Sequence, residues 1–206
     1  MYALVEDNSI TKIFPGPKGF EHNGNQYSPD IFYKWSKAEK EAIGLYEVTT
    51  DSTNYKDEKW YINTNESYTF SNGKVTRSWG TATAKAHADI LWTEQDKTDD
   101  KIPEGKDVGD VAVEGLKTIL IKTLKAQAAR ELKNTDWYVI RKADAGTAVP
   151  SSITTHRAAV RTKCSEMETA ITNAADTPAL ETLYTYTKQK DGSVTRPLGE
   201  LPTLEG

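Results

Sequence analysis

The chain has 206 residues, of which 37% are apolar and 27% charged, with a net charge of −4. This balance allows only a modest core and predicts two small domains or an elongated form rather than one large globule. No run of Lys and Arg exceeds two residues, so nucleic-acid binding is not expected. A single cysteine, Cys164, excludes an internal disulfide framework and a multi-cysteine zinc site.

Apolar stretches of the length that a membrane span needs are absent from the sequence, so membrane insertion is not expected. The first residues, MYALVEDNSITKIF, have no basic region followed by an apolar core, and we expect no signal peptide.

The first part of the chain predicts short strands joined by tight turns. Residues 1–5 and 9–14 are apolar-rich and flank Glu6-Asp7-Asn8, a hairpin signal. Asn23-Gly24 marks a second hairpin, because both residues tolerate positive φ. Ser36-Lys37-Ala38-Glu39 is a capping box and predicts a helix of about two turns that ends at Gly44.

Strands are predicted again at 45–48, 59–63, 68–70 and 75–79, with the strongest hairpin turn at 71–74. Alternation places Trp60 and Tyr61 on opposite faces of a strand, so one of them should point outward, and Tyr61 is a candidate contact residue. Most of the other aromatic side chains are expected to pack together and stabilise a β domain that has little other core. Residues 82–92 predict a short helix.

The segment 93–110, TEQDKTDDKIPEGKDVGD, has ten charged residues out of eighteen. It has too little apolar surface to fold alone, so we interpret it as an acidic linker or exposed loop that divides domain 1–92 from domain 111–206. Its carboxylates lack the spacing of a calcium-binding loop.

The remainder predicts helices. Leucines at four-residue spacing indicate a long amphipathic helix over 111–133. After an irregular stretch, a second helix begins at Pro150, and Thr177-Pro178 begins a third, before an extended tail with a hairpin at Asp191-Gly192. The predicted fold class is therefore α+β: an antiparallel β-rich amino-terminal domain followed by a helical hairpin domain.

Sequence signatures of catalysis are missing. There is no nucleophile elbow, no phosphate-binding loop and no dinucleotide fingerprint. His22, His87 and His156 lie far apart in the sequence, and none belongs to a metal-ligand spacing. His156 and Cys164 share the second helix but are eight residues, roughly 12 Å, apart, which is too far for a nucleophile and its base. We therefore expect no enzyme activity, no cofactor and no metal site.

The run 130–163, RELKNTDWYVIRKADAGTAVPSSITTHRAAVRTK, resembles a domain of bacteriophage tail-assembly-chaperone-like and tail-fibre-assembly-like proteins. That pattern has a helix end, Thr-Asp-Trp, a stretch with Pro, and a helix with aromatic-Arg-x-x-(Leu/Val)-Arg. The matching residues here are Leu132, Thr135, Asp136, Trp137, Pro150, Arg157 and Arg161, and His156 replaces the usual Tyr. The pieces LVEDNSITKIFPGPKGF, IFYKWSKAEKEAIGLYEV and KWYINTNESYTFSNGKV are similar to small tail-associated proteins of marine phages.

The resemblance implies a protein of the phage tail, located on the virion after assembly in the host cytoplasm. Its partners would be other tail or fibre proteins, and further copies of the chain, with a trimer through helix 111–133 as one hypothesis. A tail-fibre or baseplate adaptor is the first hypothesis, an assembly chaperone absent from the finished particle the second, and a glycan-binding or glycan-cleaving tail protein the third.

Four residues of the matching run are candidates for binding. Arg157 and Arg161 lie four apart and share a helix face, from which they can reach Asp136, Glu131 or the last carbonyls of the preceding helix. Trp137 is expected to lock the turn by packing between the two helices. The alternative to direct partner binding is that the whole signature is an internal clasp of the helical hairpin.

Overall fold

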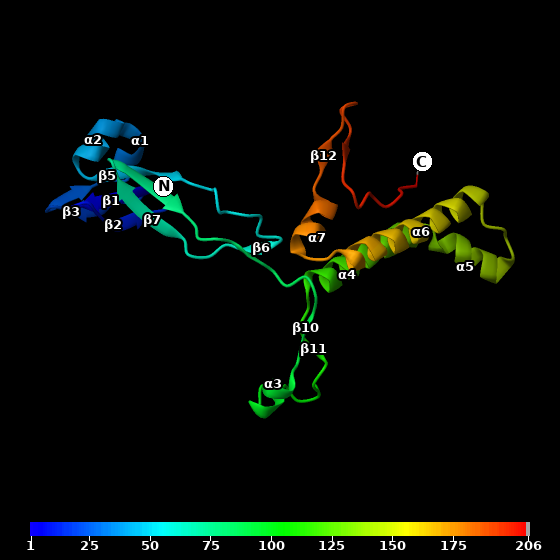
Figure 1. Ribbon diagram of the computed structural model, residues 1–206. Coiled ribbons are helices and arrows are strands. Elements are labelled where there is room, and N and C mark those ends of the chain that lie inside the picture. Colours follow the sequence, from blue (N-terminus) through cyan, green and yellow to red (C-terminus); the bar gives the residue numbers. More distant parts are fainter. Residues whose placement is uncertain (205–206) are drawn as a thin grey trace. The chain divides into compact units, whose positions relative to one another are not determined.

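The computed structural model describes residues 1–204. The chain folds as two compact units, Met1–Thr83 and Ala84–Gly206, and each is described by itself below (Figure 1). Both strands and helices are present, and the helices of more than two turns all lie in the second unit, so the α+β class is confirmed. Within residues 1–204, no helix is long and apolar enough to cross a membrane.

The first unit is a curved five-stranded sheet with two short helices. Its sheet has the order β2-β1-β5-β8-β7, and its ladders are antiparallel except for the parallel pair β5 and β8. Its elements are β1 (Tyr2–Glu6), β2 (Ser9–Phe14), β3 (Phe20–His22), β4 (Asn25–Tyr27), α1 (Ile31–Lys34), α2 (Lys37–Ala42), β5 (Leu45–Thr50), β6 (Tyr61–Ile62), β7 (Ser67–Ser71), β8 (Lys74–Ser78) and, at the unit boundary, β9 (Thr83–Ala84).

The predicted turns of this unit are confirmed. Asn23-Gly24 joins β3 to β4, and Asn72-Gly73 joins β7 to β8, with positive φ at all four positions. Positive φ at both central residues gives a turn twist that matches the twist of paired strands. The local sequence therefore fixes these hairpins.

The capping box at α2 is also confirmed. The Ser36 hydroxyl accepts the Glu39 amide, and the Glu39 carboxylate accepts the Ser36 amide. Gly44 follows the helix with φ 79°, and a Cβ there would lie 2.5 Å from the carbonyl oxygen of Val5. Glycine is thus required both by the backbone conformation and by the close approach of β1.

Apolar side chains are buried on both faces of the sheet. The larger cluster, against the two short helices, comprises Leu4, Phe14, Phe20, Ile31, Phe32 and Leu45. Ala3, Val5 and Val75 form the second cluster.

Two predictions for the first half of the chain are wrong. Residues 82–92 form no helix and instead contribute β9 and β10 (Ile90–Leu91). Trp60 and Tyr61 are both buried, at 3% and 4% exposure, because they sit where the chain turns into β6 rather than in a regular two-faced strand.

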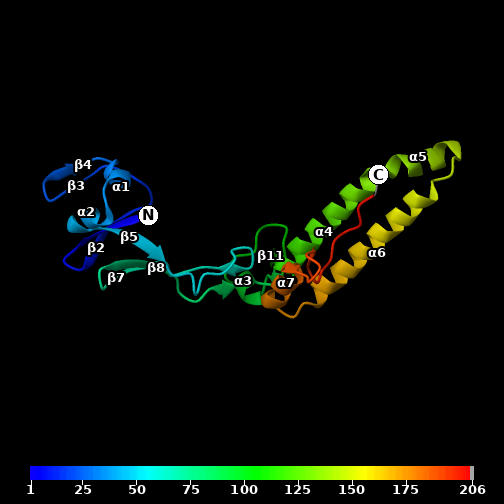
Figure 2. The ribbon, with the colours of Figure 1, turned by 90° about the horizontal axis from the view of Figure 1, so that it is seen from above.

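The second unit is built on a helical hairpin (Figure 2). Its elements are β10, α3 (Glu94–Thr98), β11 (Val111–Val113), α4 (Leu116–Lys133), α5 (Asp136–Ala145), α6 (Ser151–Asn173), α7 (Thr177–Tyr184), β12 (Thr187–Lys188) and β13 (Val194–Thr195). The buried apolar side chains of the hairpin helices are Leu120, Leu124 and Ala128 of α4 with Ile153, Val160, Met167 and Ile171 of α6. The predicted second and third helices and the tail hairpin are confirmed.

The helix predicted over 111–133 begins several residues later than expected. It is followed by a helix that was not predicted from the sequence. Residues 111–113 pair with β10 as β11, so α4 starts only at Leu116. The stretch after Lys133, expected to be irregular, contains α5, which ends at Gly146 in a left-handed conformation.

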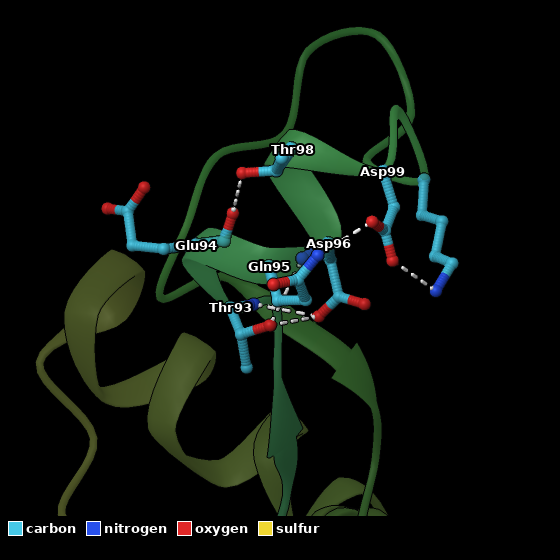
Figure 3. A network of polar contacts seen from close by, with 7 residues as sticks. Thr93, Glu94, Gln95, Asp96, Thr98 and Asp99 are labelled. Carbon is cyan, nitrogen blue, oxygen red and sulfur yellow. Dashed lines mark hydrogen bonds and ion pairs between the residues drawn. The ribbon is translucent and has the colours of Figure 1, made fainter.

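The interpretation of 93–110 as a linker between domains is also wrong. The segment closes the β10–β11 hairpin inside the second unit, and the first unit ends at Thr83, nine residues before the predicted end of the first domain. It is ordered by polar contacts instead of apolar burial: Thr93 and Asp96 form a capping box at α3, and Gln95 donates to Asp99 (Figure 3). The prediction that this segment is exposed is confirmed, since most of its side chains face solvent.

Candidate binding surface

A buried arginine joins the two long helices at the end of α4. Arg157 of α6 is 9% exposed, and its Nη1 donates to the carbonyl oxygen of Leu132 and to the hydroxyl of Thr135, each at 2.7 Å. The same nitrogen lies 2.9 Å from a carboxylate oxygen of Asp136. A guanidinium suits this place because it stays charged and donates in a fixed fork.

Thr135 is the centre of this clasp and is 1% exposed. Its hydroxyl donates to the Leu132 carbonyl and accepts from Arg157, while its amide also donates to Leu132. The last carbonyls of a helix have no partner within the helix, and here Thr135 and Arg157 supply one. The predicted contacts of Arg157 with Asp136 and with the helix end are therefore confirmed.

Trp137 does not lock the turn, contrary to the prediction. It is 50% exposed, and its ring stacks on the neighbouring Tyr138 ring, with centroids 3.8 Å apart. The Arg141 guanidinium lies 4.7 Å from the Trp137 ring, in cation–π geometry. Small, hydrogen-bonded Thr135 fills the space between the helices that was assigned to the tryptophan.

Helix α5 presents apolar side chains to solvent. It has no buried residue, and Trp137, Val139 and Ile140 are 50%, 44% and 66% exposed. Trp137, Ile140 and Arg141 are spaced three and four apart and so share one face. The clasp at Asp136 holds this helix at its first residue, which leaves its surface available for contact.

Arg141 adds a polar feature to the same face. Its Nε is buried, and within residues 1–204 it has no hydrogen-bond partner. The side chain is kept in place by the rings of Trp137 and Tyr138, the latter at 5.5 Å.

A shallow groove of about 290 Å³ runs between α4 and α6 next to the clasp. Ala128, Ala129, Leu132 and Cys164 are among its lining residues, and exposed Arg161 stands at its rim. Arg161 does not join the clasp: its Nη1 makes a long contact, 3.5 Å, with the carbonyl oxygen of Arg157.

Cys164 is not arranged as a nucleophile. Burial raises the pKa of its thiol, the nearby Glu168 carboxylate raises it further, and Lys125 opposes both. A raised pKa keeps the thiol protonated at neutral pH, and thiols attack as thiolates. Since α6 is formed, His156 stands more than two helical turns away and provides no base.

Two further candidate residues are buried in the first unit. Tyr61, proposed as a surface contact, belongs to the first unit and is buried beneath the Lys56 ammonium group, which lies 4.4 Å from its ring. His22 is 9% exposed and pairs through Nδ1 with Glu6 at 2.9 Å.

His22 closes one side of a pocket of about 520 Å³ in the first unit. The side-chain amide of Asn23 lies 3.1 Å from its Nε2, so both ring nitrogens have a polar neighbour. The pair ties the β3–β4 hairpin to the end of β1, which is a structural role.

Within residues 1–204, groups of three or more His, Cys, Asp or Glu side chains that could hold a metal ion are not found. Comparison with protein-family models, with curated proteins and with solved structures finds no match to this chain. The arrangement of α4, α5 and α6 is suited to binding another macromolecule through exposed apolar and cationic side chains.

Of the predicted site residues, Asp136 and Arg157 come together in the clasp, and Trp137 lies beside them on the surface. Arg161 lies outside the clasp, and Tyr61 is buried in the first unit. Ile140 and Arg141 were not predicted from the sequence. Their signal was present in the spacing of Trp137, Ile140 and Arg141 and in Gly146 after them, which together mark a short helix.

Proposed function

We propose that this protein is a non-enzymatic adaptor of a bacteriophage tail-fibre or baseplate apparatus that works by protein–protein binding. The observation that supports it best is α5, a helix without buried side chains that displays Trp137, Val139 and Ile140 to solvent. Aromatic and arginine side chains are the residue types that most often dominate protein interfaces. Trp137 and Arg141 supply both types on one face.

The phage context rests on the resemblance of segment 130–163. The residues that support the resemblance are also those that build the clasp: Leu132, Thr135, Asp136 and Arg157. The pattern thus has a physical meaning, because it encodes a helix end that holds α5 at a fixed place. In this proposal the protein acts on the virion tail, binds other tail or fibre proteins and forms homo-oligomers.

A co-purification experiment tests the binding role. The full chain is expressed together with the tail-fibre and baseplate proteins of the phage that encodes it, and complexes are isolated on a tag. Trp137→Ala combined with Ile140→Ser is expected to lower the recovered fibre protein at least about tenfold. Tyr33→Ala is the matched control, since Tyr33 is 77% exposed but lies on α1 of the first unit. Equal recovery with both variants would contradict a binding role for α5.

The alternative is an assembly chaperone that binds a fibre protein and leaves. Both roles use the same surface, but they differ in where the protein is found after assembly. Mass spectrometry of gradient-purified particles decides between them: an adaptor stays in the particle at a fixed copy number, and a chaperone is absent from it.

A further inference from the structure

The segment from Ile90 to Val113 forms an arm: the β10–β11 ribbon with α3 at its tip. Figure 1 shows the arm leaving the start of α4 and extending away from the α4–α6 hairpin. In the ribbon, Ile90 pairs with Val113 and Leu91 pairs with Val111. These four side chains are 50%, 55%, 47% and 40% exposed, so both faces of the ribbon show apolar surface to solvent.

An exposed two-stranded ribbon of this kind is marginally stable by itself in water, because neither face is covered. The base of the arm is nevertheless firmly held. The Asp89 carboxylate accepts the Gly115 amide at 2.7 Å and the Thr118 hydroxyl at 2.9 Å. The amides of Leu116 and Lys117 donate to the carbonyls of residues 86 and 87, so the start of α4 is capped by the chain that leads into the arm.

The tip of the arm has a strong negative charge that it does not neutralise. Segment 93–110 contains seven carboxylates and three lysines, a net charge of −4. Two of the lysines already form ion pairs inside the tip, Lys97 with Asp107 and Lys101 with Asp99. The side chain of Glu94 points away from the capping network, toward solvent (Figure 3).

Helix α4 has the opposite charge. It contains five cations and a single acidic residue, a net charge of +4. Ile119, Lys122, Ala126, Arg130 and Lys133 recur at three- and four-residue spacing and form one exposed face. Within the described residues, Arg130 and Lys133 take part in no ion pair, and Ile119 is 45% exposed.

Because the arm extends away from the α4–α6 hairpin, α3 at its tip lies apart from α4 of its own chain (Figure 1). The tip of one chain can instead contact α4 of a second chain. The lengths also agree: Ile90 to Glu94 spans about 13 Å at roughly 3.3 Å per extended residue, and Ile119 to Arg130 spans about 16 Å along the helix.

We propose that the arm docks on the exposed face of α4 of a second copy of this chain. The ribbon residues lie against Ile119, and the acidic tip lies against Arg130 and Lys133. In a reciprocal pair each chain gives one arm and one α4 face, so a single contact type occurs twice around a two-fold axis. This proposal deepens the homo-oligomer part of the proposed function, and it uses a surface separate from α5.

Sedimentation velocity on the full chain measures the association. We expect a dimer whose population grows with concentration up to about 100 µM and falls as salt is raised, because exposed charges are screened. A monomer throughout this range at low salt would overturn the proposal.

Charge reversal then tests the surfaces. One variant carries Glu94→Lys and Glu104→Lys at the tip, and another carries Arg130→Glu and Lys133→Glu on α4. Each alone should raise the dimer dissociation constant at least about tenfold, since two substitutions cancel the net charge of the tip in one variant and of α4 in the other. An equimolar mixture of the two variants should form a heterodimer, because the new lysines on the tip of one chain then face the new carboxylates on α4 of the other.

Circular dichroism at 222 nm first shows that each variant is folded, so that a mixture of folded variants that stays monomeric counts against the docking. Dimers that survive both reversals, or separately monomeric variants that fail to associate when mixed, would overturn the docking. Val113→Ser should weaken the dimer as well, while Ile140→Ser on α5 should leave it unchanged. Failure of the adaptor proposal appears instead as unaltered fibre binding in the α5 variants, so the two failures are distinguishable.

Discussion

Replacing Arg157 by Met is the sharpest test of the clasp. Methionine has a similar length, but it removes the three polar contacts that the Nη1 nitrogen makes with Leu132, Thr135 and Asp136. The loss should be moderate because the partners do not become buried and unpaired. The Leu132 carbonyl keeps the amide and hydroxyl of Thr135, and the Asp136 side chain is 51% exposed and returns to water.

These contacts set the expected magnitude. Hydrogen bonds to a charged group contribute roughly 1.5–3 kcal/mol, and breaking a buried pair costs more, roughly 3–5 kcal/mol, only when the remaining partner stays buried. The expected fall in the free energy of unfolding is therefore about 2 kcal/mol. For a unit of this size that corresponds to a fall in melting temperature of roughly 6–10 °C.

Urea denaturation followed by circular dichroism at 222 nm measures this effect, since the long helices lie in the second unit. Arg161→Met is the matched control on the same helix, one turn later. Its guanidinium is exposed and outside the clasp, so its change should stay within about 0.5 kcal/mol. Equal losses for the two variants, or no loss for Arg157→Met, would refute the reasoning.

Three other predictions concern the second unit. Gly115→Ala should destabilise it by roughly 1–3 kcal/mol in thermal denaturation, because a Cβ there would lie 2.3 Å from the Ala88 backbone. Gly16→Ala is the control, since a Cβ at Gly16 would have open space around it. Leu124→Asp should cost several kcal/mol in the same assay, since Leu124 is 2% exposed and the new carboxylate would be unpaired; an unchanged melting curve would contradict the α4–α6 packing. The pKa of Asp89 is held below its ordinary value of 3.8, first by the Gly115 amide and then by Thr118. The stability that Asp89 contributes is therefore complete above the pKa of this carboxyl in the unfolded chain, and it is lost as the pH falls toward the lower pKa of the folded protein. The stability difference between the wild type and Asp89→Asn should therefore shrink between about pH 5 and pH 2. A difference that stays constant over this range would argue against the linkage.

Local chemistry explains why the predictions for the first unit were mostly confirmed. Asn-Gly pairs and the Ser36–Glu39 capping box determine backbone geometry through contacts within four residues. The failures lie where distant contacts decide. Residues 111–113 have a helix-like apolar pattern but pair with β10, because the cap from Asp89 sets the start of α4 at Gly115.

The acidic segment shows the same limit in another form. Its composition correctly indicated that it has no apolar core, and wrongly suggested that it lacks structure. Side-chain hydrogen bonds such as the Thr93–Asp96 box order it without burial, and the strands that flank it hold its ends together.

By itself, the sequence determined the turns, the helix caps and the apolar stripes of the two long helices, because each depends on residue type and short spacing. Only the tertiary structure decided that Thr135, and not Trp137, fills the clasp, that Tyr61 is buried, and that the acidic segment is the tip of an arm. Burial depends on which segments meet across the fold, and that is set by the packing of elements that lie far apart along the chain.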